Sequence, residues 1–443
     1  MTSSFLYAQK TQMKTGVNLP DIIIYSIILK KRGYPLEGPM NNTEKLWTKS
    51  YFLTFIYAMT TQISNNMLMT GLPLYAIHLG GDNSISGMLF GFFMFVAILF
   101  RPYFGKLIDE KSRRIVLIIG AVVTAFVTFS YVVAFSISLL LVMRSLHGIG
   151  FSATTNASGT VISDIVPKRR LAEGVGYFGL SNTLATAVGP ALSIYLIQQF
   201  NYQILFIVAG LIGLISILCS LFITYEKGNS NLEFKSLKRK RKISELLYEK
   251  TALPTALVTT FIYVGMGVAL TFIPTFALSL GIKDIGLYYT VYSFALLFTR
   301  IVGGKLADKY GSSLVIIPGL VIMSTSFVVL AYANSLGDFI ISGILYGLGL
   351  GFVEPALNAV MIKLCPPDRR GAGNSTFFTA KDLGGGVGAI CLGFISLQAG
   401  FKAVFLYSAL SIIVAFFAYV FILRRQMKRE ESSKLQANIS IEI

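Results

Sequence analysis

The chain has 443 residues, of which 54% are hydrophobic and 13% are charged. An ordinary soluble protein carries about 25% charged residues, so this composition excludes a soluble enzyme and a disordered chain. Three cysteines provide neither a framework of disulfides nor a metal site. The net charge of +17 does not predict a nucleic-acid partner, because the basic residues lie in short loops between long apolar stretches. The composition therefore indicates a polytopic membrane protein.

Twelve stretches are apolar enough and long enough to cross a bilayer, which takes roughly 20 residues of helix. Their charge content is low, and the 41 glycines of the chain suit close helix packing in lipid. The predicted spans are residues 50–79, 85–106, 115–136, 138–163, 171–198, 202–224, 253–279, 285–306, 313–335, 338–363, 371–396 and 401–423.

The positive charges are distributed asymmetrically about these spans. Of the 38 Lys and Arg residues, 32 fall on one side and two, Lys283 and Lys402, on the other. Basic loops stay in the cytoplasm, so both termini are predicted to be cytoplasmic. The four remaining cations lie within spans: Arg101, Arg144, Arg300 and Lys381.

The N-terminal segment allows two interpretations. Residues 21–29 are apolar but too short to span a bilayer, and no small-residue cleavage site follows them. Either this stretch lies in the membrane interface, or translation begins at Met40 and residues 1–39 do not belong to the natural protein.

The second half of the chain repeats landmarks of the first half at an offset of about 200 residues. Five pairs occur in the same order: Pro73 and Pro274, Arg101–Asp109 and Arg300–Asp308, Gly148–Phe151 and Gly349–Phe352, Pro167–Arg170 and Pro367–Arg370, and Gly189 and Gly388. The repeat predicts an all-α membrane protein whose twelve helices form two pseudo-symmetric six-helix halves. Such halves rock around a site near the middle of the membrane in transporters.

The repeat also predicts how the chain is divided. We expect a cytoplasmic N-terminal extension (1–46), a first half (47–224), a basic cytoplasmic linker (225–252), a second half (253–423) and a cytoplasmic tail (424–443). No phosphate-binding loop of the Gly-x4-Gly-Lys-Ser/Thr type is present, so the chain carries no such loop for ATP. We expect a transporter and not an enzyme.

A loop after the second span carries the first family resemblance. Gly105-Lys-Leu-Ile-Asp109-Glu-Lys-Ser-Arg113-Arg114 and its second copy, Gly304-Lys-Leu-Ala-Asp308-Lys-Tyr-Gly311, resemble the G-x-L-a-D-r-x-G-r-r signature of the major facilitator superfamily. The resemblance covers residues 47–425 and implies that Asp109 helps to latch the halves in the outward-facing state. The residues alone give a second interpretation, in which Asp109 only orients the loop near the positive end of the next helix.

Two further segments resemble motifs of proton-coupled members. Arg144-Ser-Leu-His147-Gly-Ile-Gly150 is similar to the R-x-x-q-G-x-g motif, which implies a role of Arg144 and His147 in proton coupling. The alternative is a structural arginine that donates to carbonyls of a neighbouring helix. Gly189-Pro190 matches part of the antiporter signature and favours export. Its alternative is a proline kink with small packing residues.

Two acids lie well inside spans, Glu354 and Asp382. Acids at such depth face a partner or a cavity, and proton relays are built from them. Lys381 either pairs with Glu354 or binds an anionic substrate group. All three are candidates for proton coupling, and the alternative is a salt bridge that only joins spans 10 and 11.

Polar and aromatic residues in the spans are candidates for lining a substrate cavity. The first span has a polar stripe at helical spacing, and other spans add amides and tyrosines. The candidates are Gln62, Asn65, Asn66, Met69, Asn182, Tyr263, Tyr292 and Asn358.

These features predict a secondary transporter of the bacterial cell membrane that works by alternating access. We expect proton-coupled export of small amphipathic organic compounds, with protons as the coupling ion, no other cofactor, and function as a monomer in the bilayer. Two alternatives stay open: a proton symporter or facilitator for a sugar or an organic acid, and a non-transporting membrane sensor that signals through the basic linker.

Overall fold

The computed structural model describes residues 46–430 and 432 except 168–169, 225–248 and 367–368. Side chains that it does not describe are those of 109–110, 171–173, 301, 304–305, 307–310 and 370–371. The predictions for the N-terminal extension and for most of the basic linker therefore lie outside the described residues. The chain divides into two compact units, Met1–Trp47 and Thr48–Ile443, and all helices below belong to the second.

Every regular element among the described residues is a helix, which confirms the all-α prediction. The first half contains α3 (Lys49–His78), α4 (Asn83–Glu110), α5 (Arg113–Ser130), η1 (Tyr131–Val133), α6 (Ile137–Ile165), α7 (Leu171–Gln199) and α8 (Tyr202–Phe222). The second half contains η3 (Lys250–Ala252), α11 (Leu253–Ser279), α12 (Gly286–Tyr310), α13 (Ser312–Ala331), α14 (Leu336–Leu364), α15 (Arg370–Ala418) and η5 (Tyr419–Leu423).

Local sequence signals account for the ends of these helices. The side chains of Asp82, Ser112 and Ser136 accept hydrogen bonds from backbone N–H groups in the first turns of α4, α5 and α6. Ser335 and Asp338 form a capping box at the start of α14. These caps lie in the short connections between predicted spans, and the predicted and observed boundaries agree within about six residues, as for 115–136 and α5 (Arg113–Ser130).

The long element α15 holds the last two predicted spans. Its backbone leaves helical geometry at Gly400, where φ is +69°, a conformation that side-chain-bearing residues rarely adopt. Among the described residues, nine helices are long and apolar enough to span a membrane. The stretch Ala372–Glu430, which contains most of α15 and all of η5, counts as one of them. The number of twelve spans stays a prediction.

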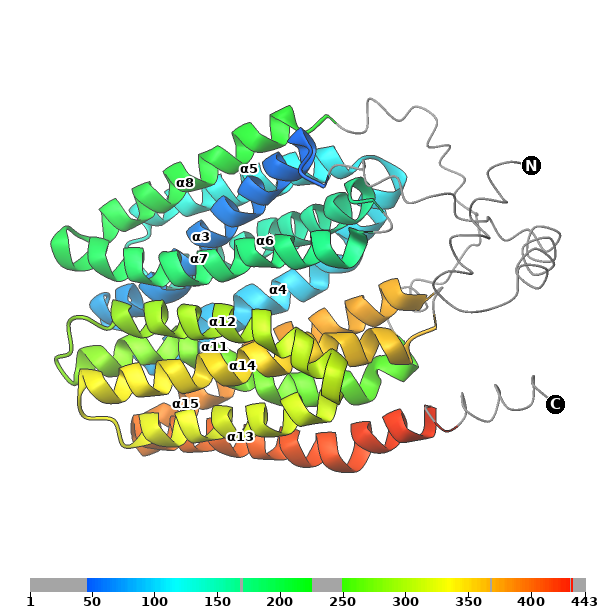
Figure 1. The fold of residues 1–443 in the computed structure, drawn as a ribbon. Coiled ribbons are helices and arrows are strands. Elements are labelled where there is room, and N and C mark those ends of the chain that lie inside the picture. The colour runs from blue at the N-terminus through cyan, green and yellow to red at the C-terminus, as the bar shows by residue number, and fades with distance from the viewer. Residues whose placement is uncertain (1–45, 168–169, 225–248, 367–368, 431, 433–443) are drawn as a thin grey trace, which may run out of the picture. The chain divides into compact units, whose positions relative to one another are not determined.

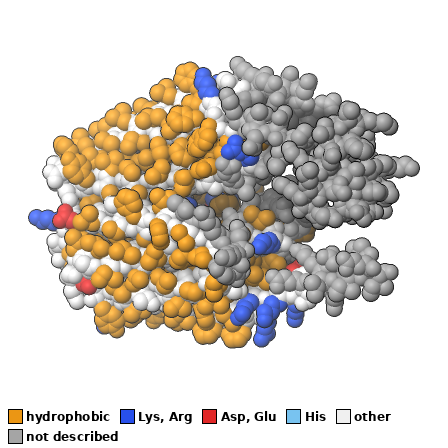
Figure 2. Space-filling model, in the orientation of Figure 1, with side chains coloured by type: hydrophobic (Ala, Val, Ile, Leu, Met, Phe, Trp, Pro, Cys, Tyr) orange, Lys and Arg blue, Asp and Glu red, His pale blue; other side chains and the backbone are white. Residues whose placement is uncertain are grey.

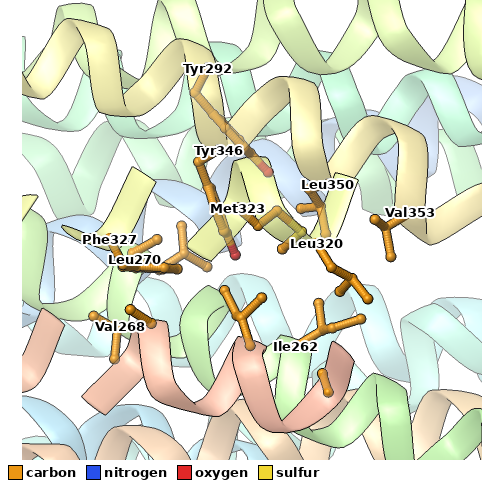
Figure 3. Packing of buried hydrophobic residues seen from close by; sticks show 14 of the residues in the cluster. Ile262, Val268, Leu270, Tyr292, Leu320, Met323, Phe327, Tyr346, Leu350 and Val353 are labelled. Atoms are coloured by element: carbon orange, nitrogen blue, oxygen red, sulfur yellow. The ribbon is translucent and has the colours of Figure 1, made fainter. Parts of the chain in front are cut away.

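Figure 1 shows the helices of the first half, α3–α8, on one side of the bundle and those of the second half, α11–α15, on the other. The halves meet mainly where α4 packs against α15 and α7 packs against α12. One cluster of buried apolar residues crosses this boundary, since Met69, Phe90 and Phe93 of the first half join residues of α11–α15. Figure 3 shows part of the cluster, with Leu320 and Met323 of α13 facing Leu350 of α14.

The surface has the pattern expected of a bilayer-spanning protein. Figure 2 shows a face covered by hydrophobic side chains, with charged side chains near the two ends of the helices. Large apolar side chains are exposed on most helices, among them Phe95, Phe126, Phe222, Phe294 and Phe298. In water such a belt would cause aggregation, whereas in a bilayer it contacts lipid.

The end of the linker is tied to the second half. Glu249 accepts hydrogen bonds from the N–H and Oγ1 of Thr251 at 3.1 and 3.0 Å and forms an ion pair with Arg369. Burial favours the neutral acid, but the Thr251 hydrogen bonds and the Arg369 charge outweigh it and lower the pKa of Glu249. Because this pKa is lowered, the stabilisation is present above the ordinary carboxyl range and is lost as pH falls through the folded-state value.

Glycine permits the close approach of the two halves at α4 and α15. A Cβ atom added at Gly87 would lie 2.2 Å from the carbonyl oxygen of Ala389, closer than any real contact. At Gly105, near the other end of the same helix, a Cβ atom would meet nothing within 4 Å. The contact between the halves therefore depends on the missing side chain at Gly87.

We expect Gly87→Ala to lower the free energy of unfolding by about 1–3 kcal/mol, because the backbones of α4 and α15 must move apart. Thermal unfolding of the purified full chain in detergent measures the change. Gly105→Ala is the matched control and should behave as the wild type. Equal losses in the two variants would contradict the assigned packing.

Candidate functional site

Two arginines occupy equivalent positions in the two halves. Arg101 lies in α4, and Arg300 lies in α12, 199 residues later. Each is within a predicted span, where a charged side chain costs roughly 2.5–3.5 kcal/mol on insertion scales. Both arginines are therefore expected to have partners, and the structure gives each of them partners in both halves.

Arg101 joins α4 to α15 of the other half. Its Nε and Nη2 donate to Oδ2 of Asp382 at 2.8 and 2.5 Å. Its Nη1 donates to Oδ1 of Asn156 in α6 at 3.2 Å, and Nδ2 of Asn156 donates to the carbonyl oxygen of Arg101 at 3.2 Å. The Arg101 and Asp382 side chains are only 13% and 11% exposed, so the ion pair is largely withdrawn from water.

Arg300 joins α12 to α7 of the first half. Its Nη2 donates to Oε2 of Glu354 in α14 at 2.6 Å. Its Nη1 donates to Oγ1 of Thr183 at 2.9 Å and to the carbonyl oxygen of Gly179 at 3.4 Å, both in α7. Arg300 is thus paired with an acid of its own half and with neutral groups of the other half.

Both halves of the repeat carry the arginine, but both acids lie in the second half. Thr183 precedes Asp382 by the same 199 residues that separate Arg101 from Arg300. The ion pair crosses between the halves at Arg101–Asp382 but stays within one half at Arg300–Glu354. Separation of the halves would therefore break the first ion pair and leave the second intact.

Glu354 has a second cation at its other oxygen. Its Oε1 accepts from Nζ of Lys381 at 2.5 Å and from the hydroxyl of Tyr263 at 2.7 Å. The Lys381 ammonium also lies 4.6 Å from the ring centre of Tyr263, 5.2 Å from that of Phe378 and 5.9 Å from that of Phe377. The Lys381–Glu354 pairing was one of the two roles that the sequence left open for this lysine.

A buried arginine without an acid lies in the first half. Arg144 is 1% exposed, and its guanidinium carbon lies 3.9 Å from the ring centre of Phe93. Its Nη2 is 2.9 Å from Sδ of Met69, and its Nη1 is 3.4 Å from Nδ1 of His147. Among the described residues no carboxylate pairs with Arg144, so its charge is held by a ring face, a sulfur and an imidazole.

Comparison with known proteins agrees with this architecture of two equivalent halves. The family description Major Facilitator Superfamily matches residues 52–284 and again residues 255–440. The chain belongs to this superfamily. It is thus a multi-pass membrane transporter and not an enzyme.

Relatives within the superfamily include exporters. A multi-drug resistance efflux pump PmrA homolog of Lactococcus lactis is 26% identical over 87% of this chain and 99% of its own length. A staphylopine export protein of Staphylococcus aureus is 25% identical over 82% of this chain and 92% of its own. A solved POT family transporter, in complex with a thioalcohol conjugated peptide, shares the fold with a TM-score of 0.70, 13% identity, and coverage of 85% of this chain and 96% of that chain.

The superfamily loop is described in part. A Cβ atom added at Gly105 would meet nothing within 4 Å. Nε of Arg113 donates to Oδ2 of Asp164 in α6 at 3.0 Å. Arg114 donates to the carbonyl oxygen of Leu221 in α8 at 2.6 Å. The side chains of Asp109 and Asp308 and the surroundings of Gly304 are not described, so the latch stays a prediction.

The polar stripe of the first span packs against a helix. Nε2 of Gln62 donates to Oδ1 of Asn182 at 3.2 Å, and Nδ2 of Asn66 lies 3.5 Å from Oγ1 of Thr186, both partners in α7. Asn65 and Asn66 are buried, and Oδ1 of Asn65 has no hydrogen-bond partner among the described residues. Residues of α7 thus contact Gln62 and Asn66, whereas Oε1 of Gln62 and Oδ1 of Asn65 have no partner among the described residues, so the cavity role of the stripe stays a prediction.

The remaining predicted residues lie at separate places. Tyr292 is buried and stacks on Tyr346, with ring centres 5.6 Å apart. Oδ1 of Asn358 is buried without a hydrogen-bond partner in the described part of the chain. A Cβ atom at Gly189 would lie 2.7 Å from Cβ of Asn66, so Gly189 with Pro190 marks the close contact of α7 with α3.

The sequence predicted that Glu354 and Asp382 lie inside spans, but it did not predict most of the residues that bind them. Arg101 and Arg300 were noted as cations within spans, but not as the residues that hold Asp382 and Glu354. The available signal was their occurrence at matching positions of the repeat, together with four intramembrane cations against two acids. Asn156 and Thr183 carried no comparable signal.

We expect the single variants Asp382→Asn and Arg101→Gln each to lower the free energy of unfolding by about 3–5 kcal/mol, because each leaves one buried charge unpaired. The double variant should lose less than the sum of the two. A double-mutant cycle by thermal unfolding in detergent measures the coupling. Additive losses would mean that the pair does not act as a unit.

Proposed function

We propose that the protein exports small amphipathic organic compounds in exchange for protons. The observation that carries the proposal is that its two intramembrane acids form ion pairs on α4, α12, α14 and α15, the helices at and beside the contact between the halves. An acid at this boundary can couple its proton to the opening of a cavity on one side or the other. In alternating access, that opening is the step that moves cargo.

Asp382 is suited to control the contact of the halves. Protonation of its carboxyl group would remove the charge that Arg101 faces across the boundary. The unpaired guanidinium would then favour an arrangement in which water reaches it. A proton on Asp382 would thus shift the equilibrium between two arrangements of the halves, as coupling requires.

Glu354 is suited to the cargo site. Its carboxylate lies between α11, α12, α14 and α15, beside the aromatic ring of Tyr263. A proton and a cargo molecule that both need this carboxylate exclude each other. That exclusion gives exchange in opposite directions, or antiport.

The direction is supported by the relatives and by one motif. Two relatives are named as an efflux pump homolog and an export protein. Gly189-Pro190 in α7 matches part of the antiporter signature. We further propose a place in the cell membrane with both termini in the cytoplasm, function as a monomer, protons as the coupling ion without another cofactor, and no nucleic-acid partner.

The test is proton flux in energised inverted vesicles, followed with a pH-sensitive dye while candidate drugs, sugars and amino acids are added in turn. We expect an exported compound to collapse part of the pH gradient in the wild type. Asp382→Asn and Glu354→Gln should reduce this response by at least about tenfold, as loss of a proton carrier implies.

The controls separate the competing functions. Equal amounts of folded protein in each vesicle preparation exclude a stability effect. Accumulation of cargo with its gradient intact in both variants would contradict proton coupling and indicate a facilitator. A response only to sugars or organic acids in right-side-out vesicles would indicate inward symport.

A further inference from the structure

The two cations on Glu354 are held in different ways. Arg300 binds Oε2 and is fixed by further hydrogen bonds to Thr183 and Gly179 across the boundary. Lys381 binds Oε1, and Glu354 is its one polar partner within the described part of the chain. In this arrangement Arg300 has three acceptors and Lys381 has one, so Lys381 is the cation that can leave more readily.

The surroundings of the Lys381 ammonium are those of a receptor for an organic cation. Three aromatic rings lie within 6 Å of it, from Tyr263 of α11 and from Phe377 and Phe378 of α15. Ring faces beside a carboxylate are the recognition chemistry of ammonium ligands. Phe378 is 42% exposed, and the Lys381 side chain is 15% exposed.

We propose that the Lys381 ammonium occupies the binding site of the cargo's cationic group while no cargo is bound. This proposal rests on the proposed function. A cationic group of the cargo takes the place of the Lys381 ammonium against Oε1 of Glu354 and the three rings. The displaced Nζ gives one proton to water and becomes a neutral amine. One positive charge enters the cluster and one leaves it, so the total charge of the cluster is unchanged.

Lysine, unlike arginine, has the chemistry for this exchange. An ammonium that loses its carboxylate in apolar surroundings can release a proton, whereas a guanidinium keeps its charge in proteins. The titratable or charged groups that face Lys381 are Glu354 of α14, Arg300 of α12 beyond that carboxylate, and Tyr263 of α11. Arg300 binds the other oxygen, Oε2, so the Glu354 carboxylate keeps a cation when Lys381 leaves Oε1.

The test uses two probes of the same shape and opposite charge, tetraphenylphosphonium and tetraphenylborate, on the purified full chain in detergent. Equilibrium dialysis measures binding, and a pH dye in weakly buffered solution measures proton release. We expect the wild type to bind the phosphonium and release close to one proton for each ion bound. Lys381→Met should bind it about tenfold tighter or more without that release, because no ammonium then competes for Oε1 of Glu354.

Two further variants sharpen the comparison. Lys381→Arg should bind the phosphonium more weakly than Lys381→Met and release no proton, since its charge is permanent. Lys402→Met is the matched control, because Lys402 also lies over a tyrosine ring, 4.2 Å from the centre of Tyr332, at a place remote from Glu354. It should behave as the wild type in both measurements.

The proposal is overturned if Lys381→Met, folded by the same thermal transition, binds the phosphonium no tighter than the wild type or still releases the proton. Preferred binding of tetraphenylborate that depends on Lys381 would also overturn it, because the lysine would then be a receptor for anions. The binding assay does not require transport. Vesicles that show no flux while these binding results hold would contradict the export function alone.

Discussion

A charge inside a bilayer needs a partner, and this constraint organises the interior of the protein. Four cations and two acids lie well inside the predicted spans; Asp382 is bound by Arg101, and Glu354 is bound by Arg300, Lys381 and Tyr263. An unpaired charge at this depth would cost more than most single packing contacts return. The helices that carry the acids are therefore fixed relative to those that carry the arginines, and these are the helices at which the halves meet.

The repeat explains why each half carries an arginine with an acid partner. The two ion pairs, Arg101–Asp382 and Arg300–Glu354, differ because both acids lie in the second half. Arg101 and Arg300 both reach across the boundary, but only Arg101 meets a carboxylate there. The Arg300 ion pair stays within its own half, where Lys381 shares the same carboxylate. Movement of the halves would therefore break the Arg101–Asp382 ion pair and the hydrogen bond of Arg300 to Thr183, whereas the ion pairs of Glu354 with Arg300 and Lys381 lie within one half.

Much of the fold could be read from the sequence, whereas the partners of the acids could not. Apolar length and polar caps determine where a helix begins and ends, and both are local properties, so predictions such as 50–79 for α3 agree with Lys49–His78. Arg101 and Asp382 are 281 positions apart, and their contact depends on which helices pack across the boundary. That choice depends on side-chain fit such as the missing Cβ of Gly87, which no periodicity reveals.

The stripe of Gln62, Asn65 and Asn66 illustrates the same limit. Polar residues on one face of a span indicate that the face avoids lipid, but a cavity and a polar neighbouring helix satisfy that requirement equally well. The structure uses α7 for Gln62 and Asn66, and its Asn182 and Thr186 match the stripe at the same separation of 120 residues.

Arg144 meets the same constraint without an acid. Its side chain is buried, and the ring face, sulfur and imidazole beside it belong to Phe93, Met69 and His147, all of the first half. Movement of the halves would leave these contacts of Arg144 within one half, whereas it would separate Arg101 from Asp382. A proton on Asp382 would remove one charge of that ion pair, and a change at a contact between the halves is one that can shift the balance between two of their arrangements.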